Sequence, residues 1–169
     1  MRLKKMLSLG LLCVGAACLG MSSGEAAKDY DRVAVSNENY KRMFGDKELA
    51  LEKTDPEMAA TMKRYLYGDN FEQSKALTDT ERELVRIACL ATIGVEDALK
   101  RETEGALNIG VKPLEIRETI YQVTPYIGFA KAVEALEAIN EVFKKNGIKL
   151  PLENQSTVTE DTRFDEGLK

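Results

Sequence analysis

The feature of this sequence that most constrains its fold is the stretch from Thr78 to Phe143, where apolar residues recur at helical spacing. Thr78 and Glu81 form a T-x-x-E capping box, which marks the N-terminus of a helix. Gly94 can end that helix in the left-handed conformation. Between these signals the apolar residues occupy nearly every side of the helical wheel, so we expect a helix that is buried on most faces.

Similar start and stop signals divide the rest of the chain into helices. Proline and N-cap residues mark the starts, while glycines and the Thr124-Pro125 pair mark the ends. Leu, Ala, Glu and Lys are plentiful and Trp is absent, which is typical of an all-α protein. Outside the helix that Thr78 opens, the signals predict helices over about 36–44, 55–67, 95–109, 113–123 and 126–146.

Two carboxylates lie on helix faces that are otherwise apolar. Glu83 falls between Ile87 and Leu90 on its helical wheel, so we expect it to point inward. A buried carboxylate needs a partner or a raised pKa, and Arg86, three residues on, is a candidate partner. The alternatives are a structural ion pair or a solvated position on the wheel.

Glu102 lies in the apolar stripe of the next predicted helix, among Val95, Leu99 and Ala106. Its neighbours in sequence fall outside the stripe. This position suggests a polar group that lines an internal cavity. The alternative is that the stripe ends near Leu99 and that Glu102 lies at its edge.

This part of the chain resembles the carboxymuconolactone decarboxylase family, which includes the AhpD-like hydroperoxidases. The resemblance rests on the motifs R-E-L-V-x-x-A at 82–88, G-A-L-N-x-G-V-x-P-x-E-I-x-E at 105–118 and P-Y-x-G-F-x-K-A at 125–132. It covers about the second half of the chain that would follow an export signal. It implies an AhpD-like helical bundle with a central antiparallel helical hairpin at the site, and a homo-oligomer such as a trimer or hexamer.

The resemblance carries only part of the family's chemistry to this chain. Glu83 matches the Glu of the first helix in AhpD-like members. The two thiols of their C-x-x-C are replaced by Val95 and Ala98, and the His that follows is replaced by Glu102. Because the thiolate is the nucleophile in that chemistry, a peroxidase or disulfide reductase is the least favoured function.

Residues 1–26 have the order of an export signal: a basic start, an apolar run and small residues before a cleavage point after Ala26. We therefore expect a periplasmic or secreted protein. Lipidation at Cys18 is less favoured, because Gly15 stands where a lipobox has a large aliphatic residue. The predicted domain occupies residues 27–147, and residues 148–169 are expected to be a mobile tail or a segment docked on a partner.

Charge and cysteine content exclude several functions. The segment 1–26 holds three basic residues and one acidic residue, so 21 basic and 27 acidic residues would remain after cleavage. Without a basic stripe, nucleic-acid binding is not expected, and no membrane span is expected in the mature chain. Cys89 would be the one remaining cysteine, packed in an apolar run, and no spacing indicates a metal or another cofactor.

The sequence therefore favours an enzyme that acts on a small carboxylated lactone, with Glu83 and Glu102 as an acid/base pair. Arg86 or Arg101 would bind the substrate anion, and Tyr121 and Tyr126 could donate to the same cavity. The alternative is a small-ligand-binding or assembly protein that kept the fold and lost the chemistry.

Overall fold

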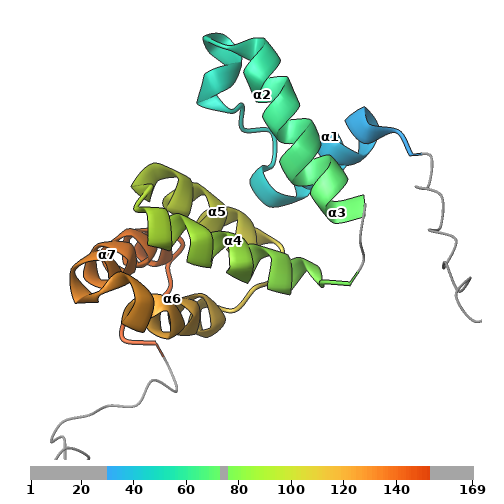
Figure 1. The fold of residues 1–169 in the computed structure, drawn as a ribbon. Helices are drawn as coiled ribbons and strands as arrows, with labels where there is room; N and C mark the ends of the chain where they lie inside the picture. Colours follow the sequence, from blue (N-terminus) through green and yellow to red (C-terminus); the bar gives the residue numbers. More distant parts are fainter. Residues whose placement is uncertain (1–29, 73–75, 153–169) are drawn as a thin grey trace, which may run out of the picture.

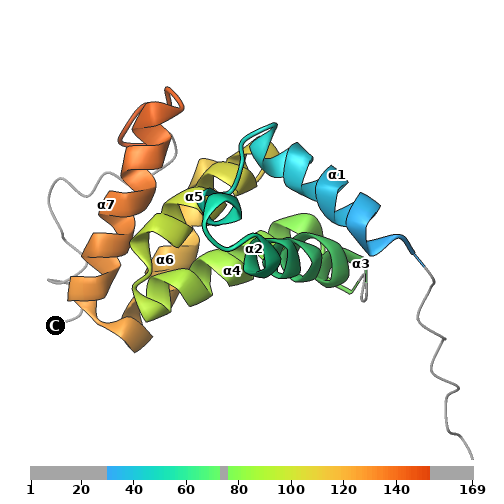
Figure 2. The ribbon, with the colours of Figure 1, turned by 90° about the horizontal axis from the view of Figure 1, so that it is seen from above.

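The computed structural model describes residues 30–72 and 76–152, and in these residues all regular structure is helical (Figure 1). This confirms the predicted all-α class. The first helices form a layer that lies on the bundle α4–α7, with α1 and α7 on opposite sides of the molecule (Figure 2). The elements are α1 (Arg32–Phe44), η1 (Ala50–Lys53), α2 (Pro56–Lys63), η2 (Arg64–Asp69), α3 (Asn70–Glu72), α4 (Asp79–Ile93), α5 (Glu96–Asn108), α6 (Pro113–Ile127) and α7 (Phe129–Lys145).

The helical hairpin α4–α5 forms as predicted from its local signals. The Thr78 hydroxyl accepts a hydrogen bond from the backbone N–H of Glu81, and the Glu81 carboxylate accepts one from the N–H of Thr78 at 2.7 Å. Gly94 ends α4 with a φ of 74°, in the left-handed region that favours glycine. The turn from α4 to α5 is only two residues long, so the two helices pack antiparallel.

The bundle α4–α7 has an aliphatic core. Helices α6 and α7 cover α4 and α5, and the buried side chains include Ile87, Leu99, Ile120, Ile139 and Phe143. The chain after α7 also packs on this core, with Leu152 buried and Ile148 and Leu150 half-buried against it. The first residues of the segment that the sequence assigned to a tail therefore lie on the chain's own bundle, while residues 153–169 lie outside the described part.

The N-terminal layer has a separate, mostly aromatic core. Its buried members are Tyr40, Met43, Phe44, Leu49, Ala59, Tyr67 and Phe71. Helix α1 begins earlier than predicted, because Asp31 rather than Ser36 caps it by accepting from the N–H groups of Val33 and Ala34. Ser36 is buried inside α1 and donates its hydroxyl to the carbonyl of Val33. Both residue types can cap a helix, and the earlier one does so here.

The helix that starts at Pro56 does not stop at Gly68, as the sequence suggested. It widens into a π-helix, η2, and continues through α3 to Glu72. Gly68 instead allows α1 to approach closely. A Cβ at this position would lie 3.2 Å from the carbonyl oxygen of Arg32 and 3.3 Å from Cβ of Ser36.

Helix α6 likewise continues past its predicted break. It includes Pro125 and ends at Gly128, whose φ is 81°. Pro125 lies in the last turn, where its missing N–H removes only one bond of the helix. Among the residues that the structure describes, no helix is both long enough and apolar enough to cross a membrane.

Candidate functional site

The two predicted carboxylates meet at one arginine. Glu83 on α4 and Glu102 on α5 are both buried, and Arg86 lies between them. One guanidinium nitrogen of Arg86, Nη1, is 3.0 Å from Oε1 of Glu83 and 3.1 Å from Oε2 of Glu102. We call Tyr67, Glu83, Arg86, Arg101 and Glu102 the carboxylate cluster.

Within this cluster Glu102 is the side chain that accepts the most hydrogen bonds. Its Oε1 accepts from the Tyr67 hydroxyl at 2.9 Å and from Nε of Arg101 at 3.1 Å, and Nη2 of Arg101 is 3.0 Å away. Its Oε2 accepts from Arg86. The sequence predicted that Glu102 would line a cavity, but here its carboxylate is surrounded by donors, which is how a buried charge is stabilised in a protein.

Glu83 has a different environment. Among the described residues neither of its oxygens has a hydrogen-bond partner, although Arg86 is close enough for an ion pair. Burial raises the pKa of Glu83 to about 7; the Arg86 charge opposes this rise and the Glu102 charge adds to it. Near neutral pH Glu83 is therefore present in both protonation states, which suits a residue that gives and takes a proton.

The two arginines of the cluster differ in their access to solvent. The side chain of Arg86 is 13% exposed; its Nη2 donates to the Leu66 carbonyl, and its guanidinium lies 5.4 Å from the centre of the Tyr67 ring. Arg101 is 32% exposed. Of the two, Arg101 is thus better placed to meet an anion from solution.

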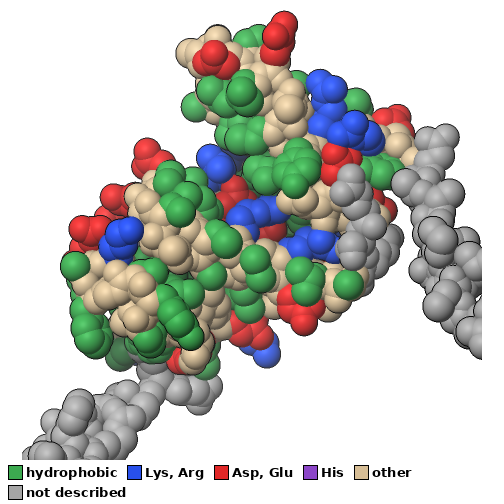
Figure 3. Space-filling view, viewed as in Figure 1, with side chains coloured by type: hydrophobic (Ala, Val, Ile, Leu, Met, Phe, Trp, Pro, Cys, Tyr) green, Lys and Arg blue, Asp and Glu red, His purple; other side chains and the backbone are tan. Residues whose placement is uncertain are grey.

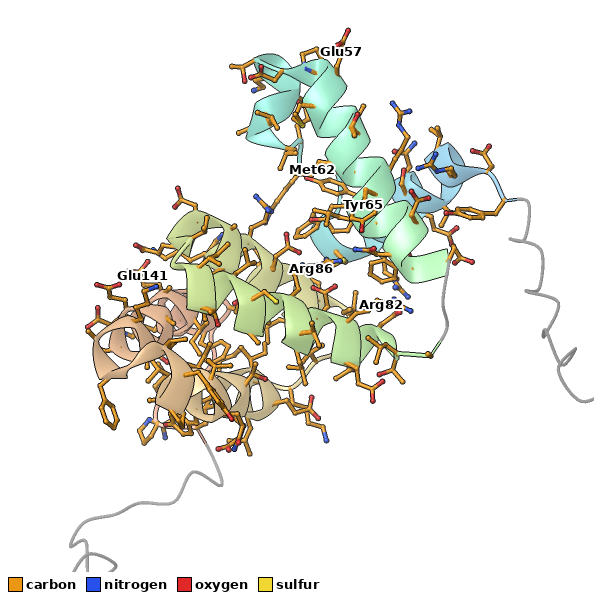
Figure 4. The ribbon with its side chains drawn as sticks, in the orientation of Figure 1. Glu57, Met62, Tyr65, Arg82, Arg86 and Glu141 are labelled. Carbon is orange, nitrogen blue, oxygen red and sulfur yellow. The ribbon has the colours of Figure 1, made fainter. Side chains whose placement is uncertain are left out.

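The cluster lies at the junction of the two cores. Arg86 projects from α4 towards η2, and Tyr65 of η2 lies above it (Figure 4). In the space-filling view the surface is hollowed between the N-terminal layer and the bundle, and basic and acidic side chains gather there (Figure 3).

The two tyrosines predicted to donate to the site do not lie in the cluster. Tyr121 and Tyr126 are on α6, which packs on the side of α4 away from η2, and Tyr126 is 88% exposed (Figure 1). Cys89 is also exposed, so its predicted role in packing is wrong for the single chain. It lies on an uncovered face of α4 with Val85 and Ile93, at i, i+4, i+8 spacing.

Tyr67 is a site residue that the sequence did not predict. Tyr65, two residues earlier on the same helix, is exposed, whereas Tyr67 is fully buried. The cause is η2, whose wider turn changes which residues face inward. A helical wheel assumes 3.6 residues per turn, so no local pattern could have identified Tyr67.

The other candidate sites in the described residues are weaker. A small cavity of about 70 Å³ lies between α7 and the turn that joins α4 to α5, and it is lined mainly by alanine and leucine side chains with Lys131 and Glu134. No group of three or more His, Cys, Asp or Glu residues in the described part could hold a metal ion. The carboxylate cluster is therefore the candidate site that the geometry favours.

Comparison with known proteins agrees with these features. The sequence profile of the Carboxymuconolactone decarboxylase family matches residues 56–141, which is just over half of the chain and includes the whole carboxylate cluster. A 4-carboxymuconolactone decarboxylase from Acinetobacter baylyi is 33% identical over 85 residues, or 50% of this chain and 63% of the relative. An uncharacterized protein of Methanocaldococcus jannaschii is 35% identical over 68 residues, or 40% of this chain and 64% of the relative.

The matches thus cover slightly less than two thirds of either relative. The match to the family profile includes the α4–α5 hairpin and the two carboxylates that it brings together. On the profile match, the helical architecture and the capped hairpin, this chain belongs to the carboxymuconolactone decarboxylase family.

Proposed function

We propose that this protein moves a proton on a small carboxylated lactone, with Glu83 as the acid/base residue. The observation that carries the proposal is the state of Glu83: it is fully buried, without a hydrogen bond to any described residue, and has a pKa raised to about 7. The Acinetobacter relative, a 4-carboxymuconolactone decarboxylase, supplies the substrate class. Buried carboxylates with a pKa raised towards neutrality are frequent among residues that exchange a proton in a reaction.

The proposed reaction divides the work among three side chains. Loss of carbon dioxide from a carboxylated lactone leaves an electron pair on carbon, and protonated Glu83 supplies the proton that this carbon takes up. Arg101 binds a substrate carboxylate at the edge of the hollow, and Arg86 keeps Glu83 and Glu102 in place. This differs from a pair of equivalent carboxylates, because Glu102 acts here as an acceptor for the arginines.

A second candidate function is the binding of a small anion without turnover. The observation in its favour is that Glu102, at the position of the family's histidine by resemblance, already accepts from Tyr67, Arg86 and Arg101. A carboxylate with these partners cannot replace an imidazole as a proton shuttle without breaking ion pairs. Glu83 would then hold a proton only because it is buried.

Turnover of 4-carboxymuconolactone by the purified full chain tests the two functions. We expect loss of the lactone and release of carbon dioxide by the wild type, and a fall of at least about 100-fold in kcat for Glu83→Gln. Glu96→Gln, an exposed position on the same hairpin, is the matched control and should keep full activity. A wild type that binds the lactone in calorimetry but does not convert it would support the binding function instead.

We also propose that the protein assembles as a homo-oligomer, a trimer or a hexamer. The support is an uncovered apolar surface in the single chain, formed by Val85, Cys89 and Ile93 of α4 and by Phe129 and Val133 of α7. Exposed apolar side chains that gather on one helix face often mark an interface between chains. Light scattering should give a mass of at least three chains, and Val85→Lys should lower it; a wild-type monomer at micromolar concentration contradicts the proposal.

Finally, we propose that the chain is exported. The support is the order of charge and apolar residues in residues 1–26, which lie outside the described part. Intact-mass measurement on protein from its native host should give a chain that starts near Ala27. A retained Met1 would refute export, and a lipid mass on Cys18 would make the protein a lipoprotein.

A further inference from the structure

We infer that Tyr67 is a positioning residue of the carboxylate cluster: its hydroxyl orients the Glu102 carboxylate so that Arg101 is held ready for the carboxylate of a ligand. The inference deepens the proposed function and rests on it in one respect, that the ligand is a small carboxylate. It gives the N-terminal layer a part in the site, although the motifs that resemble the family all lie in the bundle.

The geometry of Tyr67 supports this role. Its ring is fully buried and packs edge-on against Tyr40 and Phe44, with ring centres 5.2 and 5.5 Å apart. Its hydroxyl reaches across the junction of the two cores to Oε1 of Glu102 at 2.9 Å. The ring is thus packed in the N-terminal layer, and its hydroxyl is hydrogen-bonded to a residue of the bundle.

The backbone that carries Tyr67 is held as firmly as its ring. The carbonyl of Tyr67 accepts a hydrogen bond from the Asn39 side chain at 2.8 Å, and Gly68 lies close against α1. In the same π-helical turn, the carbonyl of Leu66 accepts from Nη2 of Arg86. One turn of η2 therefore fixes both Glu102 and Arg86, and π-helical turns are frequent at functional sites.

Tyr67 is not suited to be the proton donor of the reaction itself. Burial raises its pKa further above the ordinary value, and the nearby charge of Glu102 adds to this rise, so the phenol stays neutral. Its one proton is already donated to Glu102. Tyr67 can therefore act on a ligand only through its neighbours in the cluster, the Glu102 carboxylate that accepts its proton and the Arg101 guanidinium beside it.

The step from Glu102 to the ligand passes through Arg101. Tyr67 and Arg101 both donate to Oε1, whereas Arg86 donates to Oε2. If the Tyr67 hydroxyl is removed, the carboxylate loses the donor that fixes its rotation on the buried side. The Glu102 carboxylate then no longer holds one orientation, so the guanidinium of Arg101, which is one-third exposed, is no longer held in one position.

The test compares Tyr67→Phe with Tyr40→Phe. Both changes remove one hydroxyl from the same aromatic core, but among the described residues the Tyr40 hydroxyl has no hydrogen bond to the cluster. Because a hydrogen bond to a charged group is worth about a factor of ten or more, Tyr67→Phe should raise KM for 4-carboxymuconolactone about tenfold. It should leave kcat within about twofold, and Tyr40→Phe should change neither.

Two results of the kinetic comparison overturn the inference. A Tyr67→Phe variant with wild-type KM shows that the hydroxyl does not position the site. A fall in kcat at unchanged KM shows that Tyr67 takes part in the chemistry instead.

Calorimetric binding of succinate, a dicarboxylate that cannot react, separates this inference from the proposed function. Weaker binding by Tyr67→Phe than by Tyr40→Phe supports the positioning role even if the wild type does not turn over the lactone. Equal binding by the two variants refutes the positioning role even if the wild type is active. A wild type that neither binds succinate nor converts the lactone refutes both.

Discussion

The two cores of this molecule are built from different residues and were not predicted equally well from the sequence. The core of α4–α7 is aliphatic and lies within regular α-helices. The core of the N-terminal layer is mainly aromatic and includes a π-helix, η2. The carboxylate cluster lies where they meet, with Glu83, Arg86, Arg101 and Glu102 from one side and Tyr67 from the other.

This difference shows why a buried set of charges can persist here. The bundle supplies the two arginines that pair with the carboxylates, Arg86 from α4 and Arg101 from α5. The aromatic layer adds a phenol to Glu102 and a backbone carbonyl to Arg86. A buried ion pair is stable only when such additional bonds are present, so the N-terminal layer completes a site that the hairpin begins.

The largest effect should follow from removing the charge of Glu102, where the two cores are joined. We expect Glu102→Gln to lower the free energy of unfolding by about 4 kcal/mol, because it removes a buried charge on which the largely buried Arg86 and the partly exposed Arg101 both depend. Denaturant unfolding measures the change.

Glu104→Gln is the control for that change. Glu104 lies on the same helix and pairs at the surface with Lys47 and Lys145. Exposed pairs contribute about 1 kcal/mol or less. Equal losses from the two variants would show that the junction has no special role in stability.

Replacing Glu83 should have the opposite effect and raise the free energy of unfolding, by an amount that depends on pH. Its pKa in the folded protein, about 7, lies above the ordinary value of 4.5, so the folded state binds the proton more tightly than the unfolded state. The wild type is therefore most stable below about pH 4.5, as far as this group is concerned, and loses stability as the pH rises towards 7 and beyond.

Glu83→Gln removes that loss. The variant should be more stable than the wild type by roughly 3 kcal/mol at pH 8, with no difference at pH 4. Thermal unfolding across this range, supported by carboxyl titration in NMR spectra, measures the effect. A constant difference at all pH values would mean that Glu83 does not hold a proton in the folded protein.

Gly105 tests how closely the two cores approach. A Cβ at this position of α5 would lie 2.8 Å from two ring atoms of Phe44 and 2.9 Å from Cε of Met43. Gly105→Ala should cost about 1–2 kcal/mol, because the overlap outweighs the gain in helix propensity. Combining it with Phe44→Leu should cost less than the sum of the single changes; strict additivity would show that the two positions do not touch.

The smallest effect is expected at Cys89. It is exposed on α4, so Cys89→Ala should change the free energy of unfolding by less than about 0.5 kcal/mol. Because Val95 and Ala98 stand at the family's thiol positions, any lactone turnover should also be unchanged. Loss of activity in this variant would point to thiol chemistry after all.

The sequence predicted the bundle well because its signals are local. The capping box at Thr78, the left-handed glycine at 94 and the proline at 113 each act within a few residues. Glu83 and Glu102 were recognised because their helices have the regular period that a wheel assumes, and the structure confirms that both are buried and that Arg86 pairs with Glu83.

The parts that were missed depend on contacts between distant segments. Tyr67 faces Glu102 only because η2 departs from the α-helical period, and nothing in residues 64–69 alone requires this. The exposure of Val85, Cys89 and Ile93 was missed for another reason. A helical wheel shows that a position is apolar. It does not show whether the side chain is covered by its own chain or by a second chain.

The π-helical turn also affects how this chain should be aligned with shorter or longer relatives. Each residue advances an α-helix by about 100°. One additional residue in a turn therefore rotates the side chains before the turn by about that angle relative to the side chains after it. A homologue with one residue fewer between Arg64 and Asp69 would close this turn to an ordinary α-helix. A gapless alignment would pair Tyr67 with one residue of that homologue. The residue whose side chain faces the α4–α5 hairpin there would be a different one.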